Sequence, residues 1–143
     1  MNVPKSIDNK AVSIRTYILY WLMGVTVFTF TMKYYQGPGE EFINHWGPAS
    51  VGYVIFFMLG IIFFIPRYGA ILPVTLTVLS LTCLLEFAQR WQPVWLQGIR
   101  ETFLGKALIG STFSWLDFPA YFVGALFGAS LLHFLLRPSR IHP

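Results

Sequence analysis

Two short polar clusters interrupt apolar stretches of the sequence, and their side chains are the ones that could bind a ligand or carry a proton. Glu86 and Gln89 are three residues apart, so on a helix they share one face. Asp117, Tyr121 and Gly124 follow one another at steps of four and three residues, so they share a face as well. A carboxylate in an apolar helix is costly unless a partner compensates it, and both clusters are therefore candidate sites.

The composition indicates lipid surroundings. The 143-residue chain is 55% hydrophobic and 11% charged, whereas a soluble domain carries about 25% charged residues. We expect one domain, residues 1–143, that lies in a bilayer. Its ten Lys and Arg residues are spread along the chain, which favours membrane lipids over nucleic acid as partners. The single cysteine, Cys83, is expected to be a packing residue, and we expect no cofactor.

Four apolar stretches predict an all-α membrane protein with four transmembrane helices. They are residues 14–32, 51–65, 70–88 and 117–136. Pro66 ends the second stretch, and the short turn after it makes the second and third helices an antiparallel hairpin. Trp95, Ile99 and Phe103 lie four residues apart in the next connection, which predicts an amphipathic interfacial helix over 93–104.

The distribution of basic residues favours cytoplasmic termini. One side of the predicted topology has six of them, namely Lys5, Lys10, Arg15, Arg67, Arg137 and Arg140. The other side has four, namely Lys33, Arg90, Arg100 and Lys106. Glu86 and Asp117 then both lie at the outer face, and the interfacial helix joins their helices.

Each acidic residue has a structural as well as a functional interpretation. Glu86 could bind a ligand, a partner cation or a proton, or it could simply pair with Arg90 four residues later. Asp117 follows Ser114 in a helix-capping pattern, or it could belong to a site with Arg100 or Arg90 as counter-ion.

Other residues would complete or support such a site. Gln89 and Tyr121 could extend a hydrogen-bonded network, because a phenol away from water needs a partner. Trp115 would help to set the depth of the connection. Gly124 and Gly128 form a small-residue pair typical of a close helix contact.

Metal binding and hydrolysis are both poorly supported. Glu41 and His45 have ligand-like spacing, but two residues in a loop rich in Gly and Pro do not make a metal site. No histidine lies near Ser111 or Ser114 in the sequence to act as a base, and His133 is expected to be packed or interfacial. The chain is therefore more consistent with binding than with catalysis.

A series of motifs resembles a small bacterial membrane-protein family of unknown function (domain of unknown function 2809). The motifs are Glu86-x-x-Gln89, Pro93-x-Trp95-Leu96, Arg100, Leu104-Gly105, Leu108-x-Gly110-Ser111, Phe113-Ser114-Trp115-Leu116-Asp117, Ala120-Tyr121 and Gly124. The resemblance covers most of the chain after Lys33. It implies a bacterial plasma-membrane location and a polar site built from Glu86, Gln89 and Asp117.

That family is similar in pattern to the VanZ-like proteins, which carry Glu-x-x-Gln, a downstream Asp and a Gly-rich last span. Their teicoplanin-resistance member implies action on the outer face of the membrane. This chain departs from them in two places. It has Tyr121 where they have Asn, and it has the stretch 111–115 where they have an Arg shortly before the Asp.

Three functions remain open from the sequence. The first is non-enzymatic binding of a lipid headgroup or cell-envelope ligand at an outer-face polar site. The second is an accessory subunit of a larger respiratory, photosynthetic or transport complex that packs through aromatic helix faces. The third is a small transporter that works as a homo-oligomer, although coupling carboxylates usually lie near the middle of the membrane.

Overall fold

The computed structural model describes residues 5–40, 43, 47–90, 94–102, 105 and 113–137, and every regular element in them is helical. In chain order these elements are α1 (Lys5–Lys33), α3 (Pro48–Phe64), the 3₁₀ turn η1 (Tyr68–Ala70), α4 (Ile71–Arg90), α5 (Val94–Arg100) and α7 (Asp117–Leu136). The prediction of an all-α protein is confirmed for this part of the chain.

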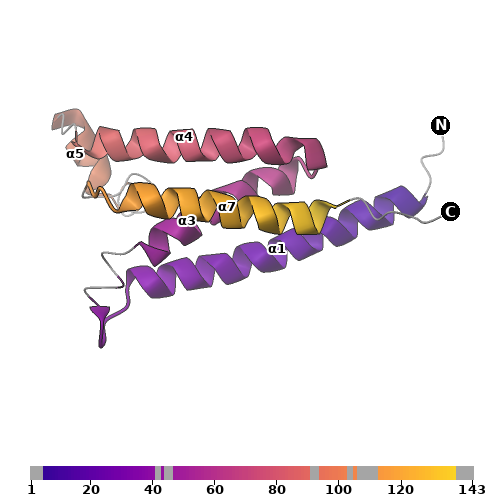
Figure 1. Cartoon of the computed structure of the whole chain (residues 1–143), viewed down its shortest axis with the longest axis horizontal. Helices are drawn as coiled ribbons and strands as arrows, with labels where there is room; N and C mark the ends of the chain where they lie inside the picture. Colours follow the sequence, from indigo (N-terminus) through magenta and orange to yellow (C-terminus); the bar gives the residue numbers. More distant parts are fainter. Residues whose placement is uncertain are drawn as a thin grey trace.

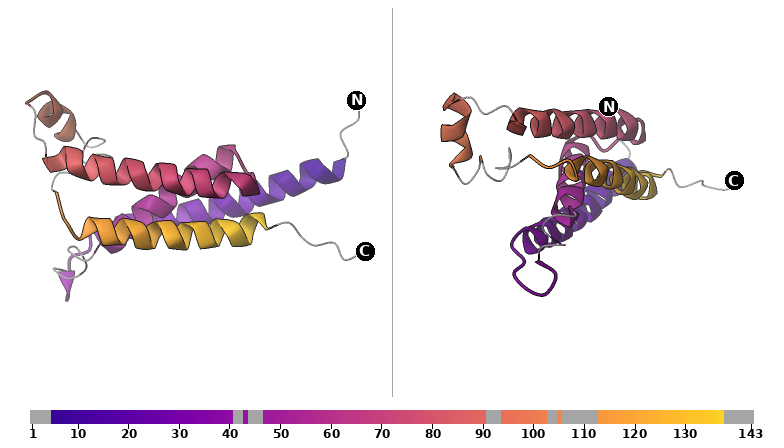
Figure 2. Two further views of the ribbon diagram at one scale, coloured as in Figure 1. Left: turned by 45° about the horizontal axis from the view of Figure 1, so that its top comes forward. Right: turned by 60° about the vertical axis from the view of Figure 1, so that its left-hand side comes forward.

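The four long helices lie side by side, with α3 packed against α1, α4 and α7 (Figure 1). Figure 2 shows α1 and α4 on opposite sides of α3 and α7. The start of α1, the η1 turn and the end of α7 lie at one end of the bundle, and α5 lies at the other. We call these the η1 end and the α5 end. The arrangement brings the end of α4 and the start of α7 together at the α5 end.

Local sequence explains where α3 begins and ends. Gly47 has φ +76°, a left-handed conformation that suits glycine, and Pro48 is tolerated in the first turn because its missing N–H would have no helical partner. At the other end Ile65 leaves the helical conformation and Pro66 prevents its continuation. The helix therefore begins three residues before the predicted 51–65.

Two other predicted boundaries differ from the structure. The first helix begins at Lys5 and not near residue 14, so the polar N-terminal residues extend it. The predicted interfacial helix over 93–104 ends at Arg100. There the N–H and the hydroxyl of Thr102 both donate to the Ile99 carbonyl, at 3.2 and 2.7 Å, which closes a tighter turn.

Small residues allow α3 to approach its neighbours closely. A Cβ atom added to Gly124 would lie 2.8 Å from the Val51 carbonyl oxygen, and one added to Gly128 would lie 2.8 Å from the Met58 sulfur. The predicted close helix contact of this glycine pair is thus made with α3. Gly52 faces α1 in the same way, against Thr29. These contacts fix how α3 crosses α7 and hence where the first residues of both helices meet.

The surface of the bundle is largely apolar, and four hydroxyl groups of the helices bond within their own helix. The hydroxyls of Thr26, Thr29, Thr75 and Ser130 each donate to the carbonyl four residues earlier. The segments Tyr68–Arg90 and Asp117–Leu136 are long and apolar enough to cross a bilayer. These features favour a membrane protein.

Candidate functional site

Glu86 is the best-enclosed polar side chain of the candidate site. It lies on the buried face of α4, four residues after Thr82, and its exposed fraction is 0%. One carboxylate oxygen accepts a hydrogen bond of 2.7 Å from the backbone N–H of Ser114. The other accepts a bond of 2.9 Å from the Tyr121 hydroxyl. Glu86 therefore connects α4 both to the segment that precedes α7 and to the N-terminal part of α7.

Asp117 lies one turn before Tyr121 and faces α3. Its Oδ1 accepts a hydrogen bond of 2.7 Å from the hydroxyl of Ser50, in the first turn of α3. Gly47 packs against the first turn of α7, because a Cβ atom added there would lie 2.7 Å from the Cβ of Ala120 and 3.8 Å from Oδ1 of Asp117. We call Ser50, Glu86, Ser114, Asp117 and Tyr121 the three-helix network, since they join α3, α4 and α7.

Asp117 lies in the first turn of α7, as the sequence predicts, but the predicted capping pattern with Ser114 does not form. The N-cap residue of α7 is Leu116, which makes no side-chain capping bond. Ser114 instead accepts a weak bond of 3.3 Å from the Leu116 N–H, two residues on. The carboxylate of Asp117 is drawn to Ser50 because α3 crosses at this point, so no reciprocal capping box forms.

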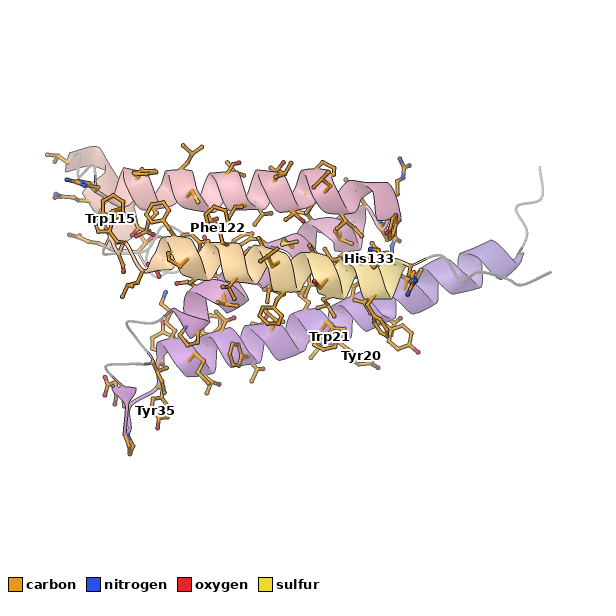
Figure 3. All side chains as sticks on the ribbon, viewed as in Figure 1. Tyr20, Trp21, Tyr35, Trp115, Phe122 and His133 are labelled. Carbon is orange, nitrogen blue, oxygen red and sulfur yellow. The ribbon has the colours of Figure 1, made fainter. Side chains whose placement is uncertain are left out.

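Aromatic side chains cover one flank of the three-helix network. The Phe118 ring lies 5.1 Å from Phe87, 5.7 Å from Trp115 and 6.5 Å from Tyr121, measured between centroids. The Trp115 side chain is 63% exposed, so this aromatic cover reaches the surface at the α5 end (Figure 3). The cover lowers the polarity around Glu86 and leaves Asp117, which is half-buried, as the more accessible acid.

The predicted basic partners do not form the expected pairs among the described side chains. Arg90 is exposed, and its guanidinium lies over the Phe113 ring, 5.8 Å from the centroid. The interpretation of Glu86 as an ion pair with Arg90 is therefore wrong, because Glu86 bonds to Ser114 and Tyr121 instead. The side chain of Arg100 lies outside the described part of the chain, as do Glu41 and His45.

Gln89 shares the buried face of α4 with Glu86, as the spacing predicts, and is 7% exposed. The described residues thus bring Glu86, Gln89, Asp117 and Tyr121 to the same end of the bundle. Sequence reasoning missed Ser50, which the structure places against Asp117. Its one signal is its position as a polar residue at the start of an apolar helix. The N–H of Ser114 carries no signal in the sequence, because any residue supplies a backbone donor.

A second polar pair lies at the η1 end. The Tyr68 hydroxyl and Nδ1 of His133 are 2.7 Å apart, and their rings are 5.2 Å apart. Figure 3 shows His133 and Trp115 at opposite ends of α7. His133 is exposed, as an interfacial histidine would be, but its pairing with Tyr68 was not predicted.

Hydrogen bonds hold the three-helix network together. Its two carboxylates accept hydrogen bonds and have no cation within salt-bridge distance among the described side chains. His133, at the far end of α7, cannot activate Ser50 or Ser114. The described residues also contain no group of three His, Cys, Asp or Glu that could hold a metal ion.

Comparison with known proteins gives a family but no function. The chain has no significant match among curated proteins or among solved structures. The model of a family described as "Protein of unknown function (DUF2809)" matches residues 39–125, which is more than half of the chain and includes all five residues of the three-helix network. The chain therefore belongs to the DUF2809 family.

Proposed function

We propose that this protein crosses the membrane four times and binds, without catalysis, the donor groups of a lipid headgroup or cell-envelope molecule at the three-helix network. The observation that carries the proposal is the Glu86 carboxylate. It is fully buried at the end of the bundle, and the described residues supply it with hydrogen-bond donors but with no cation. Buried carboxylates of this kind are either costly structural features or binding sites.

The helix lengths support four crossings. At 1.5 Å per residue, the 20 residues of α4 and of α7 each span roughly 30 Å, which matches the hydrocarbon core. The 17 residues of α3 span roughly 26 Å, and α1 with 29 residues is longer than the bilayer core requires. All four lie side by side, so a membrane that accommodates α4 and α7 would also contain most of α1 and α3.

The chemistry of the network favours a ligand with ammonium or hydroxyl donors. Asp117 is the acid that a ligand can reach. Glu86 is fully buried and is hydrogen-bonded to Tyr121, one turn after Asp117. Exposed Trp115 and the adjoining rings offer faces that attract a cation. The resemblance of the motifs to those of the VanZ-like proteins and the distribution of basic residues both favour an outer-face ligand at this end.

Phosphatidylethanolamine is a suitable probe, because its ammonium group has N–H donors and that of phosphatidylcholine has none. The full chain in mild detergent should gain thermal stability with phosphatidylethanolamine and less with phosphatidylcholine. Asp117→Asn and Glu86→Gln keep the shape of the side chain and remove its charge, so they should abolish the difference between the two lipids. Glu101→Gln is the matched control, since Glu101 is an exposed acid at the same end, outside the network.

Equal stabilisation by both lipids, or an unchanged difference in both network variants, would refute the binding proposal. Glu86→Gln retains an oxygen that can accept from the Ser114 N–H, so it keeps more of the native hydrogen bonding than an alanine variant would. If Glu86→Gln nevertheless fails to fold, Asp117→Asn decides the question by itself.

A second candidate function, that of an accessory subunit, draws on a different observation. Helix α1 packs mainly on α3 and exposes large aromatic side chains on its outer face. Figure 3 shows Tyr20 and Trp21 pointing away from the bundle. Such a face can meet lipid or a partner helix. A partner that co-purifies in fixed stoichiometry and is lost with Tyr20→Ala and Trp21→Ala supports this function, whereas a single species in mild detergent opposes it.

A further inference from the structure

An apolar groove of about 500 Å³ runs between α4 and α7, away from the three-helix network. Its volume is within the range of ligand sites, about 300–1,000 Å³. Leu72, Thr75 and Leu79 of α4 line one wall, and Phe122, Leu126 and Ala129 of α7 line the other. Figure 3 shows the length of this wall on α7, from Phe122 in the half of the helix nearer the α5 end to His133 at the η1 end.

The groove changes from apolar to polar along its length. Thr75 offers no free donor to an occupant, because its hydroxyl already donates to the Ile71 carbonyl at 2.7 Å. The polar groups Tyr68 and His133, which bond to each other at 2.7 Å, line the groove at the η1 end. An occupant that fits would therefore be a hydrocarbon chain with a polar head.

The polar end of the groove is flanked by positive charge. Arg67 directly precedes Tyr68, and Arg137 lies one turn after His133; both are exposed. Four acidic side chains that the structure describes lie toward the other end of the bundle, namely Glu40, Glu86, Glu101 and Asp117. The side chain of Asp8, near the start of α1, lies outside the described part of the chain. The charge at the η1 end thus complements an anionic headgroup and does not favour a cationic one.

We propose that this groove binds an anionic phospholipid, with one acyl chain along α4 and α7 and the phosphate between Arg67 and Arg137. From Phe122 to His133 the wall of α7 is roughly 16 Å long at 1.5 Å per residue, enough for much of an acyl chain. The Tyr68–His133 pair lies where the glycerol and phosphate oxygens would be. This site is independent of the three-helix network and at the opposite membrane face.

The test compares probes that share parts of this chemistry. The full chain in mild detergent is titrated with phosphatidylglycerol, with phosphatidylcholine and with inorganic phosphate, and the thermal midpoint is recorded. Phosphatidylglycerol should stabilise the protein most, and inorganic phosphate should not. Each basic residue near a membrane surface contributes about 1 kcal/mol, which corresponds to about a fivefold change in affinity. The double variant Arg67→Gln with Arg137→Gln should therefore have an affinity for phosphatidylglycerol about 25-fold lower than that of the native chain.

Two further variants separate the groove from general lipid contact. Ala129→Phe places a ring in the groove and should abolish the preference for phosphatidylglycerol, even with both arginines present. Lys33→Gln removes one positive charge at the α5 end and should leave the affinity unchanged. Glu101→Gln, at an exposed position outside both sites, should also leave it unchanged. Because none of these variants changes the three-helix network, failure of the network proposal does not decide this one.

Several outcomes would overturn the proposal. Equal effects of both phospholipids in the native chain would mean nonspecific lipid contact. Stabilisation by inorganic phosphate equal to that by phosphatidylglycerol would mean a phosphate site that does not use the groove. A dimer that becomes a monomer with Ala129→Phe would mean that a second copy of the chain occupies the groove. An Ala129→Phe variant that fails to fold leaves the arginine variants to decide, and full affinity in those also contradicts the proposal.

Discussion

The Tyr121 hydroxyl donates to a carboxylate oxygen of Glu86 over 2.9 Å, and this bond joins two helices whose interacting residues are 35 positions apart. Both side chains are buried, with exposed fractions of 7% and 0%. A buried hydrogen bond to a charged group is worth more than one between neutral groups, and its loss leaves the remaining partner unsatisfied. The bond is therefore a structural element of the bundle as well as part of the proposed site.

Tyr121→Phe tests how much this hydrogen bond contributes to the stability of the fold. The variant keeps the ring but removes the donor, so one oxygen of Glu86 loses its partner. We expect the free energy of unfolding in detergent to fall by about 1–3 kcal/mol. Tyr20→Phe is the control, because Tyr20 is 66% exposed on α1 and should change stability little. Equal losses in the two variants would contradict the assigned role.

The sequence predicts that Glu86 and Tyr121 lie at the same end of the bundle. Pro66 with its short turn makes α3 and α4 antiparallel, and the apolar lengths place both polar clusters at helix ends on one side. What the sequence could not provide is the partner of each oxygen. Arg90 was the predicted partner of Glu86. The Ser114 N–H bonds to it instead, because of the path that the chain takes between α4 and α7.

The contact between Ser50 and Asp117 was unpredictable for a different reason. It depends on where α3 crosses α7, and that crossing is set by how closely the backbone of Val51 can approach Gly124. A glycine pair in a helix indicates a close contact but does not say which helix makes it. The boundary errors at Lys5 and Arg100 likewise come from local turns and polar residues that apolar periodicity does not register.

A double-mutant cycle tests the coupling of Ser50 to Asp117. The variants Ser50→Ala, Asp117→Ala and the double variant should show a coupling free energy between about 0.6 and 1.7 kcal/mol, the average and the maximum for hydrogen bonds between membrane helices. Ser130→Ala serves as the control with Asp117→Ala, because the Ser130 hydroxyl bonds within its own helix. That control pair should be additive. Additivity of the Ser50 pair would show that the bond does not stabilise the fold.

Gly124→Ala tests the close approach of α3 to α7. The added Cβ would lie 2.8 Å from the Val51 carbonyl oxygen, so backbone has to move, and we expect a loss of about 1–3 kcal/mol. Gly60→Ala is the matched control in α3, since its Cβ meets nothing within 4 Å. There the better helix propensity of alanine should stabilise the protein by up to about 1 kcal/mol. Changes of the same sign and size in both variants would contradict the packing argument.

Gly47→Ala tests the close contact between Gly47 and the first turn of α7, beside Asp117. Gly47 and Gly39 have φ values of +76° and +81°, so an alanine pays a similar conformational cost of about 1–2 kcal/mol at either position. At Gly47 the new Cβ also meets the Cβ of Ala120 at 2.7 Å, whereas at Gly39 it meets nothing within 4 Å. Gly47→Ala should therefore destabilise the protein by about 1–3 kcal/mol more than Gly39→Ala, measured by thermal or denaturant unfolding.

The same pair of variants also bears on binding. If Gly47 positions the start of α3 beside Asp117, Gly47→Ala should reduce the preference for phosphatidylethanolamine over phosphatidylcholine, and Gly39→Ala should leave it unchanged. Equal stability and equal lipid preference in the two variants would mean that the clash with Ala120 relaxes without cost. The contact at Gly47 would then have no part in positioning Asp117.

Cysteine labelling tests three of the four proposed crossings, those of α3, α4 and α7. In a Cys83→Ala background, single cysteines at Gln36 and Gln97 should react with a membrane-impermeant thiol reagent in intact cells. Cysteines at Arg67 and Arg137 should react only after permeabilisation. The reason is that all four side chains are exposed, but the first two lie toward the α5 end and the other two at the η1 end. A bilayer between the two ends must separate them into accessible and protected pairs.

Each alternative labelling pattern identifies the crossing that fails. Equal labelling at Gln36 and Arg67 would mean that α3, with 17 residues, does not cross the membrane. Equal labelling at Arg67 and Gln97 would mean that α4 does not cross the membrane. Glu86 would then not lie at a membrane face. Reversed protection, with the Arg67 and Arg137 positions open in intact cells, would keep these three crossings. It would place the three-helix network at the cytoplasmic face, where an outer-face ligand could not reach Asp117.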